Sequence, residues 1–369
     1  MRKNHDSAHP DYVLVSVVGI LILFGIVILA SVSTTISQEK FGSPIFYLLH
    51  HFLFGLIPGI LAGFIAFKVS LNFLKKRALV LLLLSLFLMI LVFVPGVGIK
   101  AGGANRWLNL GFTSFQPSEF LKLTFILYLA AWLPTLTEKN RKNFSKTLIA
   151  FLMAVGLISL LLILQPDVST LVIIIVSGLL IYFLSDTPLK HNLFILVGGI
   201  SCLALLVKIA PYRLERILVF LKPDLDPMGS SYQIKQALIT VGSGGIWGKG
   251  LGLSVQKFGF LPQPMSDSIF AIFSEEMGFI GSLILILLFV IFAWQGFKIA
   301  RRTRDKFCRL ACLGIVFWIT LQAFINIGSM VGILPLTGIP LPFISYGGSA
   351  LVAELIGVGI LLNISKRVS

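Results

Sequence analysis

The chain has 369 residues, of which 57% are apolar and only 12% are charged, and its mean hydropathy is +0.97. A soluble domain of this composition would have too little polar surface to cover its core, which excludes a soluble globular protein. The net charge of +15 favours attraction to anionic membrane lipids. Binding of nucleic acid would need a soluble basic surface, which this apolar chain lacks, so nucleic acid is excluded as a partner.

The apolar stretches between clusters of charge predict about ten transmembrane helices, because one span needs about 20 apolar residues. In chain order they cover residues 12–34, 46–67, 78–96, 117–134, 147–165, 168–185, 192–210, 269–297, 308–332 and 343–364. The first span is too long for the core of a signal peptide, so no targeting segment is expected. The sequence therefore predicts an all-α integral membrane protein with a single polytopic domain over residues 1–369.

The Lys and Arg clusters of the connections all fall on one side of this threading, and by the positive-inside rule that side is the cytoplasm. Both termini are expected there. The longest outer connection, residues 211–268 between the seventh and eighth helices, predicts a large, ordered extracytoplasmic loop. Two further irregular segments, the Gly-rich and flexible 97–116 and the Pro-rich 333–345, reach the same face, which is where a site is expected.

Several charged residues lie inside or at the ends of the spans, where charge is costly and often functional. Glu119 and Lys122 share a helix face and form either a structural ion pair or the wall of a polar cavity. Asp167 is expected to cap the sixth helix. Glu354 is expected to face the bundle interior or another helix, or else to act in chemistry.

Residues 242–252 read GSGGIWGKGLG but do not fit a nucleotide-binding loop, since Ser243 and Gly250 stand where that motif needs Gly and Ser or Thr. A flexible outer loop remains, whose amides and Lys249 could meet an anion. Asp267, just before the eighth span, is either a helix N-cap or a general base acting on a lipid-linked substrate at the membrane surface. Glu275 and Glu276 favour helix capping or a helix-dipole contact at least as much as chemistry.

Five motifs resemble the SEDS family of cell-wall proteins, which includes FtsW, RodA and SpoVE, over nearly the whole chain. They read GANRWLNLGFTSFQPSEFLKL at 103–123, QPDVSTL at 165–171, YQIKQALITVGSGGIWGKGLG at 232–252, LPQPMSDSIFAIFSEEMGFIG at 261–281 and GILPLTGIPLPFISYGGSALV at 332–352. Within the family, QKFGFLPQPMSDSIF looks closer to FtsW than to RodA. Met265-Ser266 and Ser274 depart from the family pattern, which puts fine specificity in doubt.

The resemblance implies a peptidoglycan glycosyltransferase that polymerises lipid II at the outer face of the cytoplasmic membrane, at the division septum. It also implies a class B penicillin-binding protein and other divisome proteins as partners. The family's essential aspartate falls on Asp267 and its intramembrane pair on Glu119 and Lys122. The remaining motif residues of interest are Gln116, Asp167, Glu275, Glu276, Ser345 and Tyr346.

The reaction so implied is one inverting displacement, in which Asp267 is the base and undecaprenyl pyrophosphate leaves. Positive charge would bind the pyrophosphate, with arginines preferred for their two donors. The candidate cations are Lys100, Arg106, Arg213, Arg216, Lys249 and Lys257. A divalent cation, Mg²⁺ or Mn²⁺, is expected to assist, and no organic cofactor is expected.

Two rival functions stay open on the sequence. One is a lipid II transporter, in which Glu119, Lys122, Asp167 and Glu354 would line a polar path. The other is a non-catalytic division scaffold that binds a partner's transmembrane helix.

Overall fold

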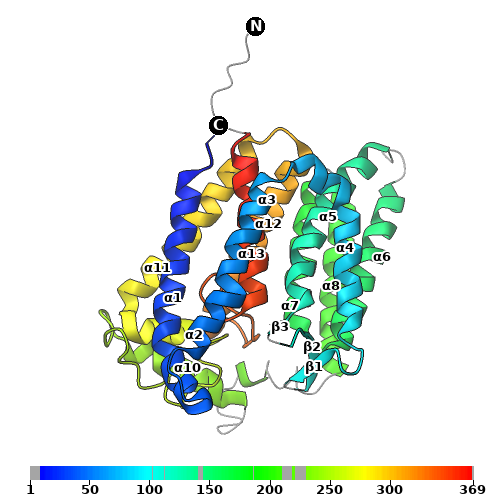
Figure 1. Cartoon of the computed structure of the whole chain (residues 1–369). Helices are drawn as coiled ribbons and strands as arrows, with labels where there is room; N and C mark the ends of the chain where they lie inside the picture. The colour runs from blue at the N-terminus through cyan, green and yellow to red at the C-terminus, as the bar shows by residue number, and fades with distance from the viewer. Residues whose placement is uncertain are drawn as a thin grey trace.

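The computed structural model describes residues 9–101, 103–111, 113–139, 144–185, 187–209, 218–220 and 230–367 as a helical bundle (Figure 1). The helices are α1 (Tyr12–Phe41), α2 (Phe46–His51) continued by the π-helix η1 (Phe52–Leu56) and α3 (Ile57–Lys68), α4 (Leu71–Leu91), α5 (Pro117–Lys139), α6 (Phe144–Leu164), α7 (Val168–Leu184), α8 (Leu189–Ile209), α10 (Ser230–Ser243), α11 (Ile269–Arg302), α12 (Lys306–Met330) and α13 (Gly348–Ser365).

Six helical segments of the described chain are long and apolar enough to cross a membrane, and α7 is a shorter apolar helix. Large apolar side chains such as Phe64 and Leu83 point outward, whereas polar ones such as Gln322 and Asn326 are buried. This inside-out distribution is that of a bundle whose solvent is lipid. The chain is therefore a multi-pass membrane protein, and the order of its helices is consistent with the predicted ten spans.

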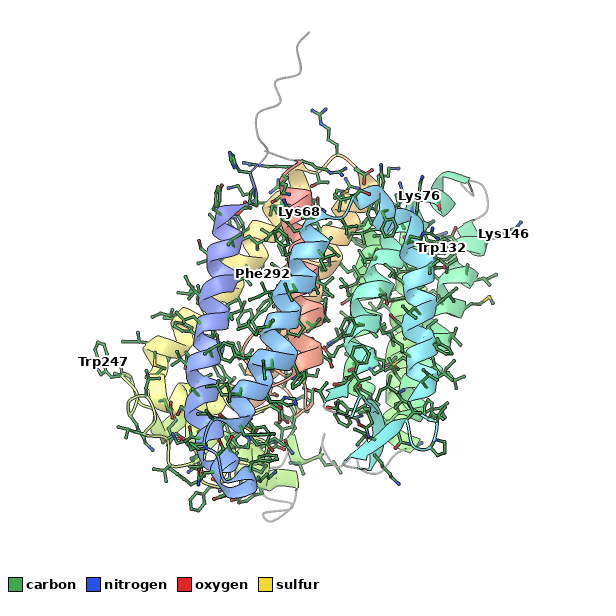
Figure 2. All side chains as sticks on the ribbon, in the orientation of Figure 1. Lys68, Lys76, Trp132, Lys146, Trp247 and Phe292 are labelled. Atoms are coloured by element: carbon green, nitrogen blue, oxygen red, sulfur yellow. The ribbon has the colours of Figure 1, made fainter. Side chains whose placement is uncertain are left out.

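The ends of the bundle differ in charge. Lys68, Lys76 and Lys146 lie at the end where the C-terminus emerges (Figure 2). The start of α1 lies at the same end, whereas the strands and α10 lie at the opposite end (Figure 1). The positive-inside rule makes the first end cytoplasmic, as the sequence predicts, and the second the outer end.

Helices α3 and α13 pack closely through small residues. A Cβ at Gly63 would lie 2.7 Å from the carbonyl oxygen of Leu355, and one at Gly359 would collide with the carbonyl oxygen of Gly63. Small residues let helix backbones approach in membranes, where packing rather than hydrophobicity joins helices. The central position of α13 thus depends on these glycines.

The outer segments are more ordered than the Gly-rich sequence suggested. Residues 98–115 contain an antiparallel sheet of β1 (Gly98–Ala101), β2 (Ala104–Asn109) and β3 (Ser114–Phe115), in the order β1-β2-β3. The expectation of a flexible 97–116 loop was wrong, because strand pairing satisfies its backbone. Of the predicted 211–268 loop, residues 211–217 and 221–229 lie outside the described residues, while α10 and the chain from 244 to 268 are ordered.

Candidate functional site

Asp267 lies at the outer end, in the turn that leads into α11. Its Oδ2 accepts a hydrogen bond from Gln233 Nε2 of α10 at 3.3 Å, and its Oδ1 accepts one from Ser266 Oγ at 3.0 Å. The N-cap of α11 is Ser268, so the capping alternative for Asp267 does not match the structure. The carboxylate is half-buried, and the neutral side chains of Gln233 and Ser266 donate to it.

The irregular segment 331–347 and Asn326 of α12 support the backbone at Asp267 and the two residues before it. Asn326 Nδ2 of α12 donates to the carbonyls of both Asp267 and Ile339, at 2.8 and 2.7 Å. Ser345 Oγ donates to the carbonyl of Ser266 at 2.5 Å, and Tyr346 N donates to that of Met265 at 2.8 Å. The predicted convergence of this Pro-rich segment with Asp267 is thus present in the structure.

The intramembrane pair is formed and connects to the same segment. Lys122 Nζ lies 2.7 Å from Glu119 and 2.9 Å from Gln322 Oε1, and both charged side chains are buried. Gln322 Nε2 in turn donates to the carbonyl of Pro340 at 3.1 Å and to Glu354 at 3.4 Å, while Glu354 accepts from Phe343 N at 2.9 Å. This network braces residues 340–343 from inside the bundle.

Arg106, one of the predicted pyrophosphate ligands, joins β2 to the turn between α6 and α7. Its guanidinium donates to the carbonyl of Gln165 at 3.2 Å and to that of Pro166. Asp167 caps α7 by accepting from Thr170 N at 3.3 Å, as predicted. Ser169 Oγ then donates to the carbonyl of Thr337 at 2.5 Å, so this turn also contacts the 331–347 segment.

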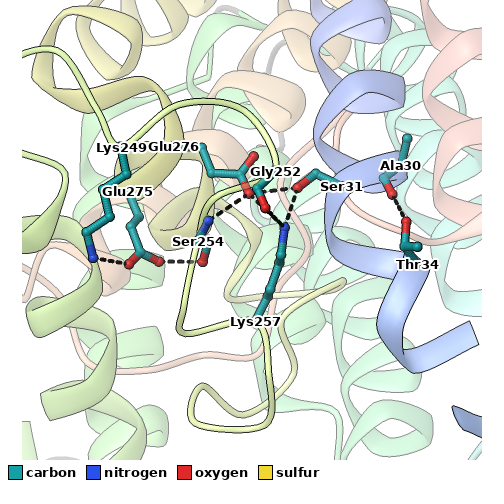
Figure 3. A network of polar contacts seen from close by, with 9 residues as sticks. All are labelled: Ala30, Ser31, Thr34, Lys249, Gly252, Ser254, Lys257, Glu275 and Glu276. Carbon is teal, nitrogen blue, oxygen red and sulfur yellow. Dashed lines mark hydrogen bonds and ion pairs between the residues drawn. The ribbon is translucent and has the colours of Figure 1, made fainter. Parts of the chain in front are cut away.

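The predicted cations differ in what they contact. Lys100 is exposed on β1, whereas Lys249 and Lys257 form ion pairs with Glu275 (2.6 Å) and Glu276 (3.3 Å). Figure 3 shows this cluster, in which Ser254 also donates to Glu275 and Ser31 Oγ of α1 donates to Glu276 at 2.7 Å. These two glutamates therefore do not cap α11, and Lys257 is buried away from the outer surface.

Arg213 and Arg216 lie outside the described residues. Among those described, no three His, Cys, Asp or Glu side chains form a group able to hold a metal ion. The divalent cation therefore remains a prediction.

A family model described as "Cell cycle protein" and named for FtsW, RodA and SpoVE matches residues 11–369. The chain belongs to this FtsW/RodA/SpoVE family. "Stage V sporulation protein E" of Bacillus subtilis is 39% identical over 360 residues, covering 97% of each chain. "Probable peptidoglycan glycosyltransferase FtsW" of Thioalkalivibrio sulfidiphilus is 38% identical, covering 94% of this chain and 87% of its own.

Solved structures show the same fold. A chain described under "Structural coordination of polymerization and crosslinking by a peptidoglycan synthase complex" superposes with a TM-score of 0.77 at 28% identity, covering 97% of this chain and 98% of its own. The rod shape determining protein RodA of Thermus thermophilus superposes with a TM-score of 0.70 at 27% identity, covering 97% of both chains.

Several polar residues of the site in this FtsW/RodA/SpoVE chain were not singled out from the sequence. Gln233, Gln322 and Asn326 carry no charge, so a search for intramembrane charges passes over them. The four-residue spacing of Gln322 and Asn326 within an apolar span was a usable signal, because it places both amides on one helix face. His50 was also missed, although its Nδ1 lies 2.9 Å from the hydroxyl of Tyr346.

Two motif residues have positions but no assigned chemistry. Gln116 joins β3 to α13, since its backbone N donates to Ser349 Oγ at 3.0 Å. The Tyr346 hydroxyl lies 2.9 Å from His50 Nδ1, which links the end of the 331–347 segment to α2. Both residues hold the 331–347 segment and the start of α13 in place.

Proposed function

We propose that this protein is a peptidoglycan glycosyltransferase that polymerises lipid II at the outer face of the cytoplasmic membrane. The observation that carries the proposal is the setting of Asp267, a half-buried carboxylate at the outer end that accepts hydrogen bonds from Gln233 and Ser266. Membership in the FtsW/RodA/SpoVE family supports the reaction class, because a relative that aligns with 94% of this chain is named as a probable peptidoglycan glycosyltransferase.

In the proposed reaction, the Asp267 carboxylate takes the proton of the GlcNAc 4-hydroxyl of one lipid II molecule as that oxygen attacks the MurNAc C1 of the growing chain. The C1–oxygen bond to undecaprenyl pyrophosphate breaks, and the sugar carbon inverts. One base is enough for such a displacement, unlike the carboxyl pair of a retaining glycosidase. Gln233 and Ser266 would orient the carboxylate.

The departing pyrophosphate needs positive charge nearby. Lys100 is exposed at the outer end, and Arg106 has donors beyond the two that bind carbonyls, so these are the first candidates among described residues. Arg213 and Arg216 remain candidates from the sequence. Lys249 and Lys257 are weaker ones, because each is already paired with a glutamate.

We further propose action in cell division at the septum, together with a class B penicillin-binding protein and other divisome proteins. The support for a crosslinking partner is the superposition on a chain from a peptidoglycan synthase complex, described in terms of polymerisation and crosslinking. The support for division is the identity with FtsW relatives.

The test is polymerisation of labelled lipid II by purified protein, alone and with its penicillin-binding partner. Asp267→Asn keeps the size of the side chain and removes the base, and we expect the rate to fall by about 10²–10⁴-fold. Asp305→Asn, a carboxylate loss at the cytoplasmic end of α12, is the matched control and should retain activity. Unchanged polymerisation by Asp267→Asn would sink the assignment of the base.

A transport function is the second candidate, and the buried polar set of Glu119, Lys122, Gln322 and Glu354 is the observation in its favour. These groups bond to one another and to backbone in the structure, which favours a structural role. Scrambling of lipid II in liposomes without glycan polymer would favour transport. Normal division with Asp267→Asn in cells would favour the scaffold alternative.

A further inference from the structure

The backbone of the Gly-rich segment 244–250 completes a broken helix. The backbone of α11 leaves helical geometry at Gly278, with φ 68° and ψ −168°. The segment satisfies the groups that this break frees: Lys249 N donates to Glu275 O (2.9 Å), Gly250 N to Glu276 O (3.0 Å), Phe279 N to Gly245 O (2.9 Å) and Ile280 N to Ile246 O (3.2 Å). Irregular backbone at membrane depth is tolerated when neighbouring segments pair its groups in this way.

The fit between the two segments requires glycine. A Cβ at Gly248 would collide with the carbonyl oxygen of Glu276, and one at Gly278 with the backbone N of Gly248. Two lysines of the loop also point toward α11: Lys249 pairs with Glu275, and Lys257, farther along the loop, pairs with Glu276 (Figure 3). The inner face of the loop is thus polar and fully engaged with α11.

The opposite face of the loop is apolar and exposed. Trp247 is 80% exposed and points away from the bundle (Figure 2). The other large apolar side chains exposed in this loop are Ile246, Leu251, Leu253, Val255, Phe258 and Phe260. Phe279, in the part of α11 that pairs with the loop, is exposed as well, so the face continues the lipid-facing surface of α11. An apolar outer face over a polar inner one is the reverse of a loop that faces water.

The length of α11 gives the depth of this face. From the break to Arg302 the helix has about 24 residues, or about 36 Å at 1.5 Å per residue. It ends in Arg301 and Arg302 at the cytoplasmic end, and the hydrocarbon core is about 30 Å thick. The break and Trp247 therefore lie near the outer boundary of the hydrocarbon, the level at which Trp is enriched in membrane proteins.

We infer that the face formed by Ile246, Trp247, Leu251, Leu253, Val255 and Phe258 is seated in the outer leaflet, where it contacts phospholipid acyl chains just below the headgroups. The loop between α10 and α11 is then a lipid-contacting re-entrant segment rather than a water-exposed loop. The inference concerns lipid contact and holds whichever reaction the protein catalyses.

Tryptophan fluorescence in vesicles tests this directly. The protein is reconstituted into phosphatidylcholine vesicles with chains that are unmodified, brominated near the headgroup, or brominated near the chain end. The difference in emission between the wild type and W247F isolates Trp247. We expect bromine near the headgroup to remove most of this emission, bromine near the chain end to remove less, and aqueous iodide to have little effect.

Two other tryptophans calibrate the measurement. Trp294 is 61% exposed on α11 toward its cytoplasmic end and should be quenched by lipid, whereas Trp318 is fully buried and should not be. If iodide quenches Trp247 and brominated lipid does not, the face meets water, and the inference is overturned in favour of a protein-docking surface. Should W247F fail to fold, L253W adds a reporter on the same face with the same expected pattern.

Discussion

Lys122→Met removes a positive charge from the interior of the bundle, where Lys122 Nζ contacts Glu119 at 2.7 Å and Gln322 at 2.9 Å. The substitution also removes the cation–π contact between the Lys122 ammonium and the Trp318 ring, whose centroid lies 5.2 Å away. The Glu119 carboxylate would remain buried without its partner. Removing one member of a buried pair typically costs about 3–5 kcal/mol, so we expect the free energy of unfolding to fall by about that amount.

The double variant Glu119→Gln/Lys122→Met removes both charges of the pair while keeping side chains of similar size, so it tests whether the unpaired charge causes the loss of stability. Since a buried pair can often be replaced by neutral groups of similar size at little cost, most of the lost stability should return. Denaturant unfolding of the protein in micelles, followed by helical circular dichroism, measures both variants. Lys76→Met, at an exposed position of α4, is the control and should stay within about 0.5 kcal/mol of the wild type.

Two outcomes would refute this reasoning. If Lys122→Met is as stable as Lys76→Met, the pair does not stabilise the bundle. If the double variant is as unstable as the single one, an unpartnered carboxylate is not the cause of the loss. A stable double variant that no longer polymerises lipid II would instead place the pair in the reaction.

Three further perturbations follow from the structure. Gly63→Leu should separate α3 from α13 and lower stability by about 1–3 kcal/mol in the same unfolding assay; Gly19→Leu, where a Cβ meets nothing within 4 Å, is its control. Arg106→Ala should free the sheet from the α6–α7 turn, and hydrogen exchange across residues 98–109 should accelerate; unchanged exchange would show that strand pairing alone orders it. Burial alone would raise the pKa of Asp305, but the hydrogen bond from Cys308 N and nearby cations hold that pKa below its ordinary value of 3.8. Its contribution to stability is therefore present above that value and lost as the pH falls through the lower folded-state pKa, and Asp305→Asn should flatten this acid dependence while Asp305→Ala also loses about 1 kcal/mol of capping.

The sequence was sufficient for features that depend on local pattern. The ten apolar stretches and their charge clusters predicted the order of the helices, because hydrophobic length and Lys and Arg placement are local properties. The three-residue spacing of Glu119 and Lys122 predicted their ion pair, and the position of Asp167 predicted its cap on α7. The Pro-rich 333–345 segment was correctly expected to be irregular beside the site.

Features that depend on contacts between residues far apart in the chain could not be predicted from the sequence. From the sequence, Lys249 and Lys257 were expected to be cations of an outer loop that could bind an anion. In the folded protein they form ion pairs with Glu275 and Glu276. The break at Gly278 has no proline to signal it, and its cause lies in residues 244–250. The sheet at 98–115 was hidden because its glycines indicate flexibility as readily as the turns of a hairpin.

The break in α11 bears on how Asp267 is positioned. Residues 269–277 lie between the aspartate and Gly278, so the direction of this half-helix is not fixed by the membrane-spanning half that follows. It is fixed by the 244–257 loop on one side and by Asn326 and the 331–347 segment on the other. The half-helix is also packed in the core, where Ile269–Phe273 are buried and the Phe273 ring contacts that of Phe24 in α1. We therefore expect changes within the 244–257 loop and the 331–347 segment to move the Asp267 carboxylate more than changes at the α3–α13 glycines do.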